Sequence, residues 1–350
     1  MSSTYKDIQR ITGYSLGTIS KYFNGGSLRA KTKKDIEAAV ARLDYRVNGF
    51  ARGLKSRKSM TIGLLIPEIN GIFATTILRL IVQFFRQRGY SCLICDCDSD
   101  TNIEVESLDF LLDKMVDGII TIPTDTSGKH LERAHTRNIP VVLVDRKVDD
   151  FDADTVVIDN YSAGKTAAEY LRDFGHVNVA VISGTQDVYT MKQRCSGFVD
   201  AFSQLRKSTF TKKNNVRVME TNLTVESGYI AAKDLLTNDN NITAIFCANY
   251  ELTLGTIMAM KELGIKYPAG TSLFGFDNIE IVRTLSPSIT LMAQPMELLA
   301  QSASNLLLER LEHGSIFSPK TIMLDTTLIE GNSVSNLFDK ANQMKDGLAR

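Results

Sequence analysis

No apolar run in this chain approaches the roughly 18 residues that a helix needs to cross a bilayer, and its first ten residues are polar. The sequence therefore predicts no membrane-spanning helix, and we expect a cytoplasmic protein. A composition of 43% hydrophobic and 23% charged residues is typical of soluble globular domains. At 350 residues the chain exceeds the usual size of one hydrophobic core, so we expect two or three compact units.

The five cysteines show no disulfide framework, because their number is odd. Three of them, Cys92, Cys95 and Cys97, lie in the apolar run 91–97, where side chains alternate between two faces. No histidine is near them and no second ligand pair is present. We therefore favour reduced core cysteines over a metal site or a redox sensor, and expect no metal and no cofactor.

Catalytic signatures are also missing from the sequence. It contains no P-loop, no G-x-S-x-G, no H-E-x-x-H, and no G-x-G-x-x-G after a predicted strand. Its four histidines are scattered, and the pair Gly184-Thr185 after a predicted strand is interpreted as a turn. We predict that the protein is not an enzyme.

The chain has no net charge, but this total hides two differently charged parts. The first sixty residues carry 13 Lys+Arg against 4 Asp+Glu, a net charge of +9, and the remainder carries −9. A small basic part joined to an acidic part indicates a polyanionic partner for the basic one, and repulsion between that partner and the acidic one.

Three short helices are predicted in the basic part, over 5–12, 16–23 and 31–43. Thr4 and Asp7 match a capping pattern for the first helix, Gly13 provides a turn, and Ser15 can cap the second helix. Two helices joined by a short turn that contains Gly are typical of a helix-turn-helix.

The second helix presents small, hydroxylic and basic side chains that suit the major groove of DNA, with its first turn toward the bases. A basic helical domain with a merely solvated face is the alternative. The DNA contacts we expect in the helices are Thr4, Tyr5, Ser15, Leu16, Gly17, Thr18, Ser20, Lys21 and Asn24.

From residue 61 onward, short apolar runs alternate with amphipathic helical stretches such as 72–88. This alternation predicts parallel α/β sheets covered on both faces, arranged as two lobes with a ligand crevice at the strand ends. The strand candidates are 61–66, 91–97, 118–122, 141–145, 156–158, 178–183, 216–219, 244–248 and 272–275.

The order of residues is more specific than these patterns. The pattern T-x-x-D-I-x-x-x-x-G-x-S-x-x-T-I-S-x-x-x-N runs from Thr4 to Asn24, and A-x-x-x-L-x-Y-x-x-N and A-R-x-L follow it from Ala39 to Leu54. It resembles the DNA-binding head of the lactose-repressor/galactose-repressor family of transcriptional regulators. The resemblance implies a hinge helix over 48–54 that orders on DNA, with Asn48, Arg52 and Leu54 as contacts and Leu54 as a minor-groove wedge.

The resemblance continues to about residue 334, through I-G-L-L-I-P at 62–67, I-P-V-V-L-V-D-R at 139–146 and L-F-G-F-D-N at 273–278. It implies a core similar to periplasmic sugar-binding proteins, with three crossings between lobes. Tyr250 and Leu223 depart from the family, which often has Asp and an aromatic residue there, so a sugar phosphate or a nucleobase-like effector stays open beside a sugar. The effector contacts implied are Phe73, Asp145, Arg146, Asp159, Arg194, Asn249 and Asp277.

These observations predict a helix-turn-helix domain over 1–46, a hinge and linker over 47–60, an effector core over 61–334 and a tail over 335–350. Within the core we expect lobe 1 at about 61–160 and 290–320, and lobe 2 at about 161–289 and 321–334. The predicted function is a homodimeric regulator, with repression favoured, that binds palindromic double-stranded operator DNA under control of a small polar effector. The alternative is a cytoplasmic sugar sensor without specific DNA readout.

Overall fold

The structure is a computed structural model that describes residues 4–23, 25–45, 58–124, 126–203, 215–277, 284–314 and 318–339. The chain divides into two compact units, Met1–Ser59 and Met60–Arg350, which we call the head and the body. No helix within these described ranges is long and apolar enough to span a membrane.

The head contains the three predicted helices, α1 (Tyr5–Thr12), α2 (Leu16–Phe23) and α3 (Ala30–Arg42). The Asp7 carboxylate accepts hydrogen bonds from the Thr4 backbone N–H (2.9 Å) and hydroxyl (2.8 Å), and Gly13 ends α1 in the left-handed conformation. Ile8, Ile19 and Ile36, one from each helix, are fully buried and form a small common core. The helix-turn-helix prediction is therefore confirmed at the level of the fold.

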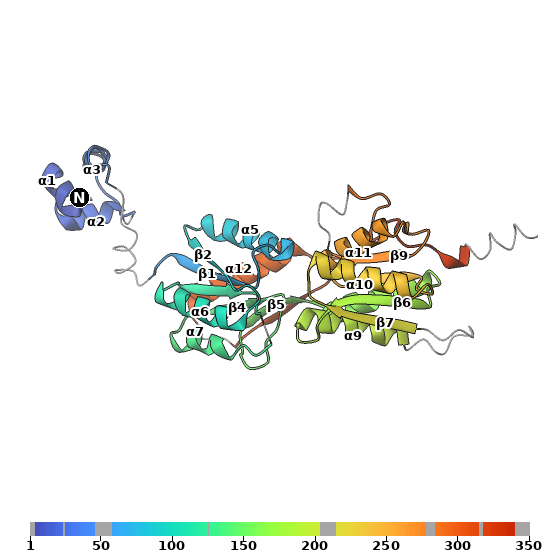
Figure 1. Ribbon diagram of the computed structural model, residues 1–350. Coiled ribbons are helices and arrows are strands. Elements are labelled where there is room, and N and C mark those ends of the chain that lie inside the picture. Colours follow the sequence, from blue (N-terminus) through green and yellow to red (C-terminus); the bar gives the residue numbers. More distant parts are fainter. Residues whose placement is uncertain are drawn as a thin grey trace, which may run out of the picture. The chain divides into compact units, whose positions relative to one another are not determined.

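The body contains two six-stranded sheets built by the described residues, each covered by helices (Figure 1). The first sheet has the order β11-β5-β4-β3-β1-β2, and all its pairs are parallel. Its strands are β1 (Thr61–Ile66), β2 (Ser91–Asp96), β3 (Gly118–Thr121), β4 (Val141–Val144), β5 (Asp154–Ile158) and β11 (Thr321–Leu324). The helices of this lobe are α5 (Ile72–Arg86), α6 (Thr101–Asp113), α7 (Glu132–Thr136) and α12 (Met296–His313).

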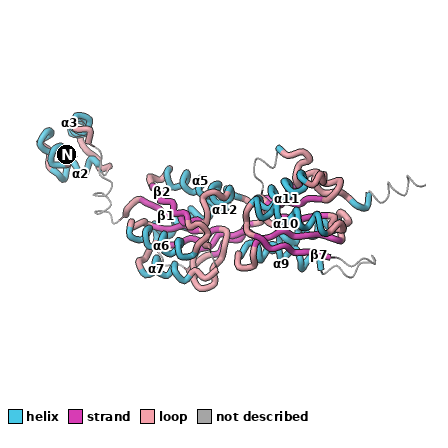
Figure 2. Tube along the Cα trace, in the orientation of Figure 1, coloured by secondary structure: helices cyan, strands magenta, loops and turns pink. Residues whose placement is uncertain are grey.

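The second sheet has the order β12-β10-β9-β8-β6-β7, and only β12, which pairs with β10, is antiparallel. Figure 2 shows its strands side by side between helices. The strands are β6 (Asn178–Gly184), β7 (Asn215–Thr221), β8 (Ala244–Cys247), β9 (Ser272–Phe276), β10 (Thr290–Ala293) and β12 (Thr327–Ile329). The helices of this lobe are α8 (Asn160–Asp173), α9 (Tyr189–Ser203), α10 (Val225–Asn238) and α11 (Tyr250–Glu262).

The chain passes between the two sheets three times, from β5 to α8, from β10 to α12 and from β11 to β12. The predicted crossings are thus present, but two expected boundaries are wrong. β10 belongs to the second sheet, whereas 290–320 was assigned to lobe 1, and β11 belongs to the first sheet, whereas 321–334 was assigned to lobe 2. The reason is that each of these short strands is the last element in its sheet before the chain crosses to the other lobe. Neither strand has a hydrophobic pattern long enough to be predicted from the sequence.

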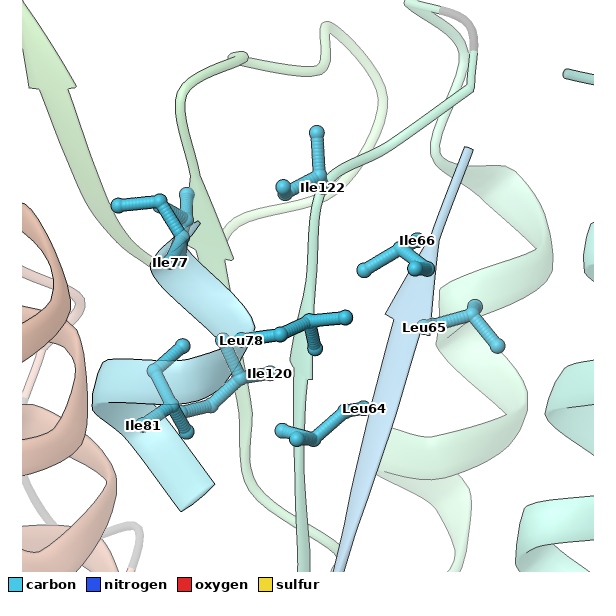
Figure 3. Close-up of a pocket in the computed structure, with 9 residues that line it drawn as sticks. Leu64, Leu65, Ile66, Ile77, Leu78, Ile81, Ile120 and Ile122 are labelled. Carbon is cyan, nitrogen blue, oxygen red and sulfur yellow. The ribbon is translucent and has the colours of Figure 1, made fainter. Parts of the chain in front are cut away.

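The central strands of the first sheet, β1, β3, β4 and β5, are buried on both faces, as expected for a parallel sheet covered by helices. Successive residues of β1 point to opposite sides: Leu64 and Ile66 pack with α5, and Leu65 packs with the α6 side (Figure 3). The α5 side encloses a cavity of about 10 Å³ lined only by apolar side chains. A space of one water molecule without polar partners is a packing defect and not a ligand site.

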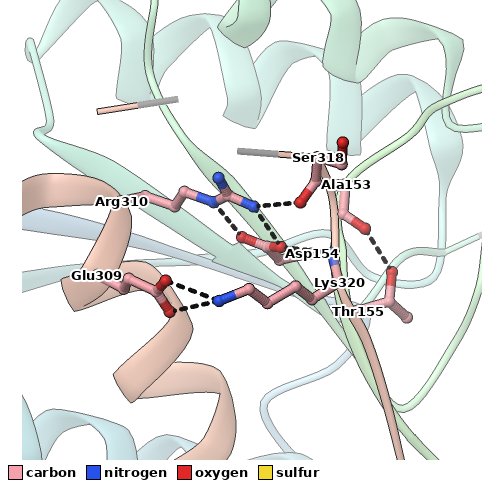
Figure 4. A network of polar contacts seen from close by, with 7 residues as sticks. All are labelled: Ala153, Asp154, Thr155, Glu309, Arg310, Ser318 and Lys320. Atoms are coloured by element: carbon pink, nitrogen blue, oxygen red, sulfur yellow. Dashed lines mark hydrogen bonds and ion pairs between the residues drawn. The ribbon is translucent and has the colours of Figure 1, made fainter. Parts of the chain in front are cut away.

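The end of α12 is fastened to the first sheet by a buried ion pair (Figure 4). Arg310 donates two hydrogen bonds to the Asp154 carboxylate, at 2.6 and 2.8 Å, and a third to the Ser318 carbonyl. The backbone N–H of Lys320, beside β11, donates to the same carboxylate at 2.8 Å. Asp154 therefore holds β5, β11 and α12 together.

The cysteines are free thiols, and Cys97, Cys195 and Cys247 are buried, as predicted for core residues. Cys92 and Cys95 are half-buried because they lie on the edge strand β2. Burial raises the pKa of Cys92 to about 11 and that of Cys247 to about 12. Thiols held protonated in this way are poor nucleophiles and poor metal ligands.

Candidate functional site

The exposed face of α2 is the candidate DNA-binding surface of the head. Leu16 is 41% exposed, and Ser15, Gly17 and Lys21 are exposed beside it. The Ser15 hydroxyl caps α2 by accepting from the Thr18 backbone N–H at 3.2 Å. Lys31, Lys33 and Lys34 are exposed on α3 and add a sequence-independent attraction for phosphates.

Other residues proposed for DNA contact have structural partners or are less exposed. The Tyr5 ring stacks on Phe23, with centroids 5.1 Å apart, and also contacts Tyr45, while the Thr4 hydroxyl donates to Asp7. Thr18 and Ser20 are half-buried. Asn24, Asn48, Arg52 and Leu54, and the whole expected hinge, lie outside the described residues.

In the body, two carboxylates occupy equivalent places in the two lobes. Asp145 follows β4 and Asp277 follows β9, which hold the same third position in the two sheet orders. Each backbone N–H donates to the next strand, Asp145 to Val156 and Asp277 to Met292, and each residue has a left-handed backbone, with φ of 69° and 70°. Asp tolerates this backbone conformation better than most residues, which explains why Asp occurs at both of these equivalent strand ends.

Arg194 is a buried cation that interacts electrostatically with both carboxylates. It is 2% exposed, donates to the Asn160 side chain and to the Ala248 carbonyl at 2.7 Å each, and lies 3.7 Å from the Phe276 ring centroid. Burial lowers the pKa of Arg194, while the Asp277 and Asp145 carboxylates raise it. An arginine stays cationic in such a site, so its charge is fixed.

The close approach of α8 and α9 places Arg194. A Cβ on Gly164 would lie 2.0 Å from the Arg194 carbonyl oxygen, and one on Gly197 would lie 2.0 Å from the Tyr161 carbonyl oxygen. Only glycine fits at these two crossing points, which bring the α9 backbone against the start of α8. The guanidinium then meets Asn160 in the first turn of α8.

Asn249 and Asp277 lie at neighbouring strand ends in the second lobe. Asn249 caps α11, because its Oδ1 accepts from the Leu252 backbone N–H at 2.9 Å. Asp277 accepts from the Gln294 side chain at 2.6 Å. Burial raises the pKa of Asp277, and Arg194 and the Gln294 hydrogen bond oppose this rise.

Glu251 belongs to the same group and was not predicted. Its Oε2 accepts from the Asn249 Nδ2 at 2.8 Å. Burial, together with the Asp277 and Glu68 carboxylates, raises the pKa of Glu251 to about 7, and Arg194 opposes this rise. An acid in the first turn of a helix is usually a dipole partner on the surface, so no sequence signal distinguished this one.

On the first lobe, Asp145 and Arg146 lie side by side. Burial raises the pKa of Asp145, Arg146 and Arg194 lower it, and Asp277 raises it. Arg146 Nη1 donates to the Pro123 and Thr124 carbonyls, at 2.9 and 3.3 Å, and its Nε lies 3.7 Å from Asp145. We call Glu68, Asp145, Arg146, Arg194, Glu251 and Asp277 the interlobe charge cluster.

Two further residues that were predicted to contact the effector, Asp159 and Phe73, have other partners in the structure. Asp159 caps α8, accepting from the Ser162 backbone N–H at 2.9 Å and from its hydroxyl at 2.7 Å. Phe73 is half-buried in the first turn of α5 and packs against the core of the body. The structure thus brings together Asp145, Arg146, Arg194, Asn249 and Asp277, and gives Asp159 a capping role at the first crossing.

A helical DNA-binding head and a bilobed core with charged groups at its strand ends define a ligand-responsive DNA-binding protein. Residues 62–314 match the family described as "Periplasmic binding protein domain". The chain belongs to the LacI/GalR family of transcriptional regulators.

Two curated relatives align over most of their length. Catabolite control protein A of Priestia megaterium is 31% identical, over 85% of this chain and 89% of its own. The HTH-type transcriptional repressor PurR of Actinobacillus pleuropneumoniae serotype 3 is 29% identical, over 96% of this chain and 99% of its own. The expectation that the chain is not an enzyme is confirmed, and the family favours a regulator over a sensor without DNA readout.

Two solved structures are similar to the whole chain and to the body, respectively. The lac repressor dimer bound to operator and the anti-inducer ONPF aligns with a TM-score of 0.83 and 22% identity, over 96% of this chain and 100% of that one. A LacI family regulator from Enterococcus faecalis V583 with bound ribose aligns with a TM-score of 0.70 and 29% identity, over 79% of this chain and 99% of that one.

Proposed function

We propose that this chain is a repressor that binds a palindromic operator as a homodimer, and that a small polar effector at the interlobe charge cluster controls its affinity for that operator. Two heads related by two-fold symmetry read two half-sites. The effector changes the relation of the lobes, and through the hinge segments it changes how well both heads bind together. The binding free energies of effector and operator are thereby coupled.

The observation that carries the effector part is the arrangement of Asp145, Arg194 and Asp277. The first comes from one lobe and the other two from the second, and the three groups interact electrostatically. Carboxylates and a fixed guanidinium read adjacent hydroxyl groups by hydrogen bonds. A ligand bound between them makes different contacts in open and closed arrangements of the lobes, as an allosteric effector must.

The DNA part is supported by the head. Its net charge and the exposed, nearly neutral face of α2 favour a helix that enters the major groove while lysines contact phosphates. In the solved lac repressor complex, a similar chain is bound to operator as a dimer. For this chain we propose that Leu16, Gly17 and Lys21 contact base edges and that Leu54 enters the minor groove.

The operator can be identified by selection from random DNA duplexes. Fluorescence anisotropy at several salt concentrations then measures the affinity of the protein for the selected site. We expect a two-fold symmetric consensus, with an affinity that falls steeply as salt rises. Leu54→Ala is expected to lose specific binding and keep non-specific attraction. A fragment of residues 59–350 that bound the selected site as well as the full chain would contradict the proposal.

The effector site is tested by a thermal-shift screen of sugars, sugar derivatives and purines. A compound that raises the melting temperature should also change operator affinity. Asp277→Ala is expected to abolish the shift, because it removes a carboxylate that the Gln294 hydrogen bond holds in place. An unchanged shift in that variant would move the effector away from the interlobe charge cluster.

A further inference from the structure

We propose that Glu104, a buried acid of α6, positions Arg146 for effector binding by fixing the peptide group between residues 123 and 124. Glu104 is a positioning residue, because it reaches Arg146 only through the backbone of that segment. The inference rests on the proposed function for the role of Arg146 at the effector site. The contacts of Glu104 themselves do not depend on that function.

The burial of Glu104 is unusual for its place in the chain. It lies in the first turn of α6 and is 0% exposed. An acid in a first turn usually stays at the surface, where it complements the helix dipole. The cap of α6 is supplied by Asp100, whose Oδ1 accepts from the Asn102 backbone N–H at 2.7 Å. Since burial of a carboxylate is costly unless it is hydrogen-bonded or paired, the partners of Glu104 indicate its role.

One carboxylate oxygen of Glu104 holds the segment that follows β3. Its Oε2 accepts from the Thr124 backbone N–H at 3.0 Å. Thr124 lies three residues beyond the end of β3, at the edge of the sheet from which Asp145 and Arg146 also leave β4. A hydrogen bond from a backbone N–H to a carboxylate is stronger than one between neutral groups. Helix α6 therefore fixes the path of the chain at this strand end.

The same segment holds Arg146 from its other side. Arg146 Nη1 donates to the Pro123 carbonyl at 2.9 Å and to the Thr124 carbonyl at 3.3 Å. The Pro123 carbonyl and the Thr124 N–H belong to one planar peptide group, and they point in opposite directions. Glu104 and Arg146 thus bind the two ends of a single peptide plane. Hydrogen bonds in such a chain polarise and strengthen one another.

His130 faces the other carboxylate oxygen of Glu104. It belongs to the short helix η1 (Lys129–Leu131), its side chain is 8% exposed, and its Nε2 lies 3.4 Å from Glu104 Oε1. Neither of these two atoms, nor Thr124 Oγ1, has a hydrogen-bond partner among the described residues. Buried polar atoms without such partners reduce stability. An arrangement that carries this cost is more typical of a functional site than of a core optimised for stability.

The fixed peptide group determines the orientation of the Arg146 guanidinium. The Arg146 side chain is only 14% exposed, and its Nε is buried without a hydrogen-bond partner among the described residues. Because Nη1 is held by two carbonyls, the guanidinium plane is set before a ligand arrives, and Nε and Nη2 stay available on one edge. A side chain that is ordered in advance loses less entropy on binding. Glu104 provides this order from outside the site.

The test measures how firmly Arg146 is held in the full-length protein without effector. Arginine is isotope-labelled for nuclear magnetic resonance, and the Arg146 Nε signal is assigned by its loss in Arg146→Met. The measured quantity is the rate at which the Nε proton exchanges with water. Glu104→Leu retains a long side chain that suits a helix and removes the acceptor. We expect it to increase this rate about tenfold.

Two further variants separate positioning from a general loss of stability. Glu104→Gln retains an oxygen that accepts from the Thr124 N–H, so its exchange rate should stay within about twofold of the wild-type rate. Asp154→Asn is the matched control, because Asp154 is another buried acid of the same lobe. It binds Arg310 at the start of β5, whereas Arg146 follows the end of β4. This control should destabilise the lobe and leave the Arg146 rate unchanged.

An unchanged rate in Glu104→Leu would overturn the inference, and so would an equal increase in Asp154→Asn. An increase in Glu104→Gln as large as in Glu104→Leu would also overturn it, because the acceptor would then not be what holds the segment. Calorimetry with ribose as the probe follows the consequence for binding, and the exchange rates decide the positioning role whether or not ribose binds. We expect Glu104→Leu to weaken ribose binding about fivefold. Equal ribose affinity in wild type and in a Glu104→Leu protein with faster exchange would instead remove Arg146 from the proposed effector site.

Discussion

The two lobes have the same strand order but complete their halves of the site to different degrees. In the second lobe Asp277 accepts from Gln294 at 2.6 Å and lies beside the fixed Arg194. In the first lobe the equivalent Asp145 has its nearest cation at 3.7 Å and receives no hydrogen bond from the described residues. We infer that the second lobe holds the effector first, and that the first lobe adds its contacts when the lobes close.

Arg194→Met should have the largest effect on stability. The variant leaves Asp277 and Asp145 buried without their shared cation, and breaking a buried charge pair costs roughly 3 to 5 kcal/mol. Arg146→Met is the matched change in the first lobe, where the guanidinium bonds only backbone carbonyls and lies 3.7 Å from Asp145. Urea unfolding of both variants measures the difference, and equal losses would show that the lobes do not differ in this way.

The two lobes also differ in the hydrogen bonds that hold their C-terminal segments to the sheets. In the first lobe Asp154 binds Arg310 and the Lys320 backbone, whereas in the second lobe the Ser333 hydroxyl accepts from the Thr290 backbone N–H at 2.8 Å and donates to the Leu273 carbonyl. Asp154→Asn should destabilise the protein by about 3 kcal/mol and Ser333→Ala by about 1 to 2 kcal/mol. The reason is that only Asp154→Asn leaves a buried charge, that of Arg310, without its partner.

Both variants of that pair lie outside the interlobe charge cluster, so effector affinity should not change in either. Chemical unfolding measures the stabilities, and calorimetry with a compound found in the thermal-shift screen measures the affinity. A larger loss for Ser333→Ala than for Asp154→Asn would mean that hydroxyl bonds, and not the ion pair, dominate these junctions.

How far the sequence predicted the structure differs between elements. The sequence predicted the exact ends of two helices, 5–12 and 16–23, and of the strand 61–66. Capping residues mark the ends of these helices, and a continuous apolar run marks the strand. The strands β10, β11 and β12 were not predicted. They are three or four residues long, and β11 and β12 lie at sheet edges, where their residues are exposed or half-buried.

The site shows the same division. Asp145 and Asp277 were predicted because they follow strong strand patterns, and Arg194, which lies in α9, was predicted from the resemblance to the family. Glu251 was missed because its charged neighbours Asp277, Glu68 and Arg194 come from three other segments of the chain. Asp159 was assigned to the effector, and its capping bonds to Ser162 depend on where α8 begins.

Glu251→Gln should change the pH dependence of stability. Burial raises the pKa of Glu251 to about 7 in the folded chain, above the ordinary 4.5. Between these values the unfolded chain releases a proton that the folded chain keeps, so wild-type stability falls as pH rises through this window and the loss is complete above pH 7. The variant should therefore be more stable at pH 8 by roughly 1 to 3 kcal/mol, with a difference near zero at pH 4.5.

Urea unfolding at several pH values between 4.5 and 8 measures this difference, with Glu226→Gln as the exposed control in the equivalent first turn of α10. A constant offset between wild type and Glu251→Gln would show that the substitution acts through packing. A variant less stable than the wild type at pH 8 would mean that the folded protein favours the charged carboxylate, opposite to what its burial implies.

Asp145→Asn should have the smallest effect and the one most specific to the first lobe. Asn adopts the left-handed backbone nearly as readily as Asp, so the φ of 69° adds little strain. Since no hydrogen bond from the described residues reaches the Asp145 carboxylate, the free energy of unfolding should change by less than about 0.5 kcal/mol.

Effector affinity should fall about fivefold, near 1 kcal/mol, through loss of a charge-assisted hydrogen bond on closure. Calorimetry measures this loss of affinity, and stopped-flow measurement of both rates should place it in the dissociation rate, since the second lobe still captures the ligand. A variant that lost more than about 1 kcal/mol of stability would make Asp145 a structural residue of its lobe, and the two strand ends would then differ in function as well as in completeness.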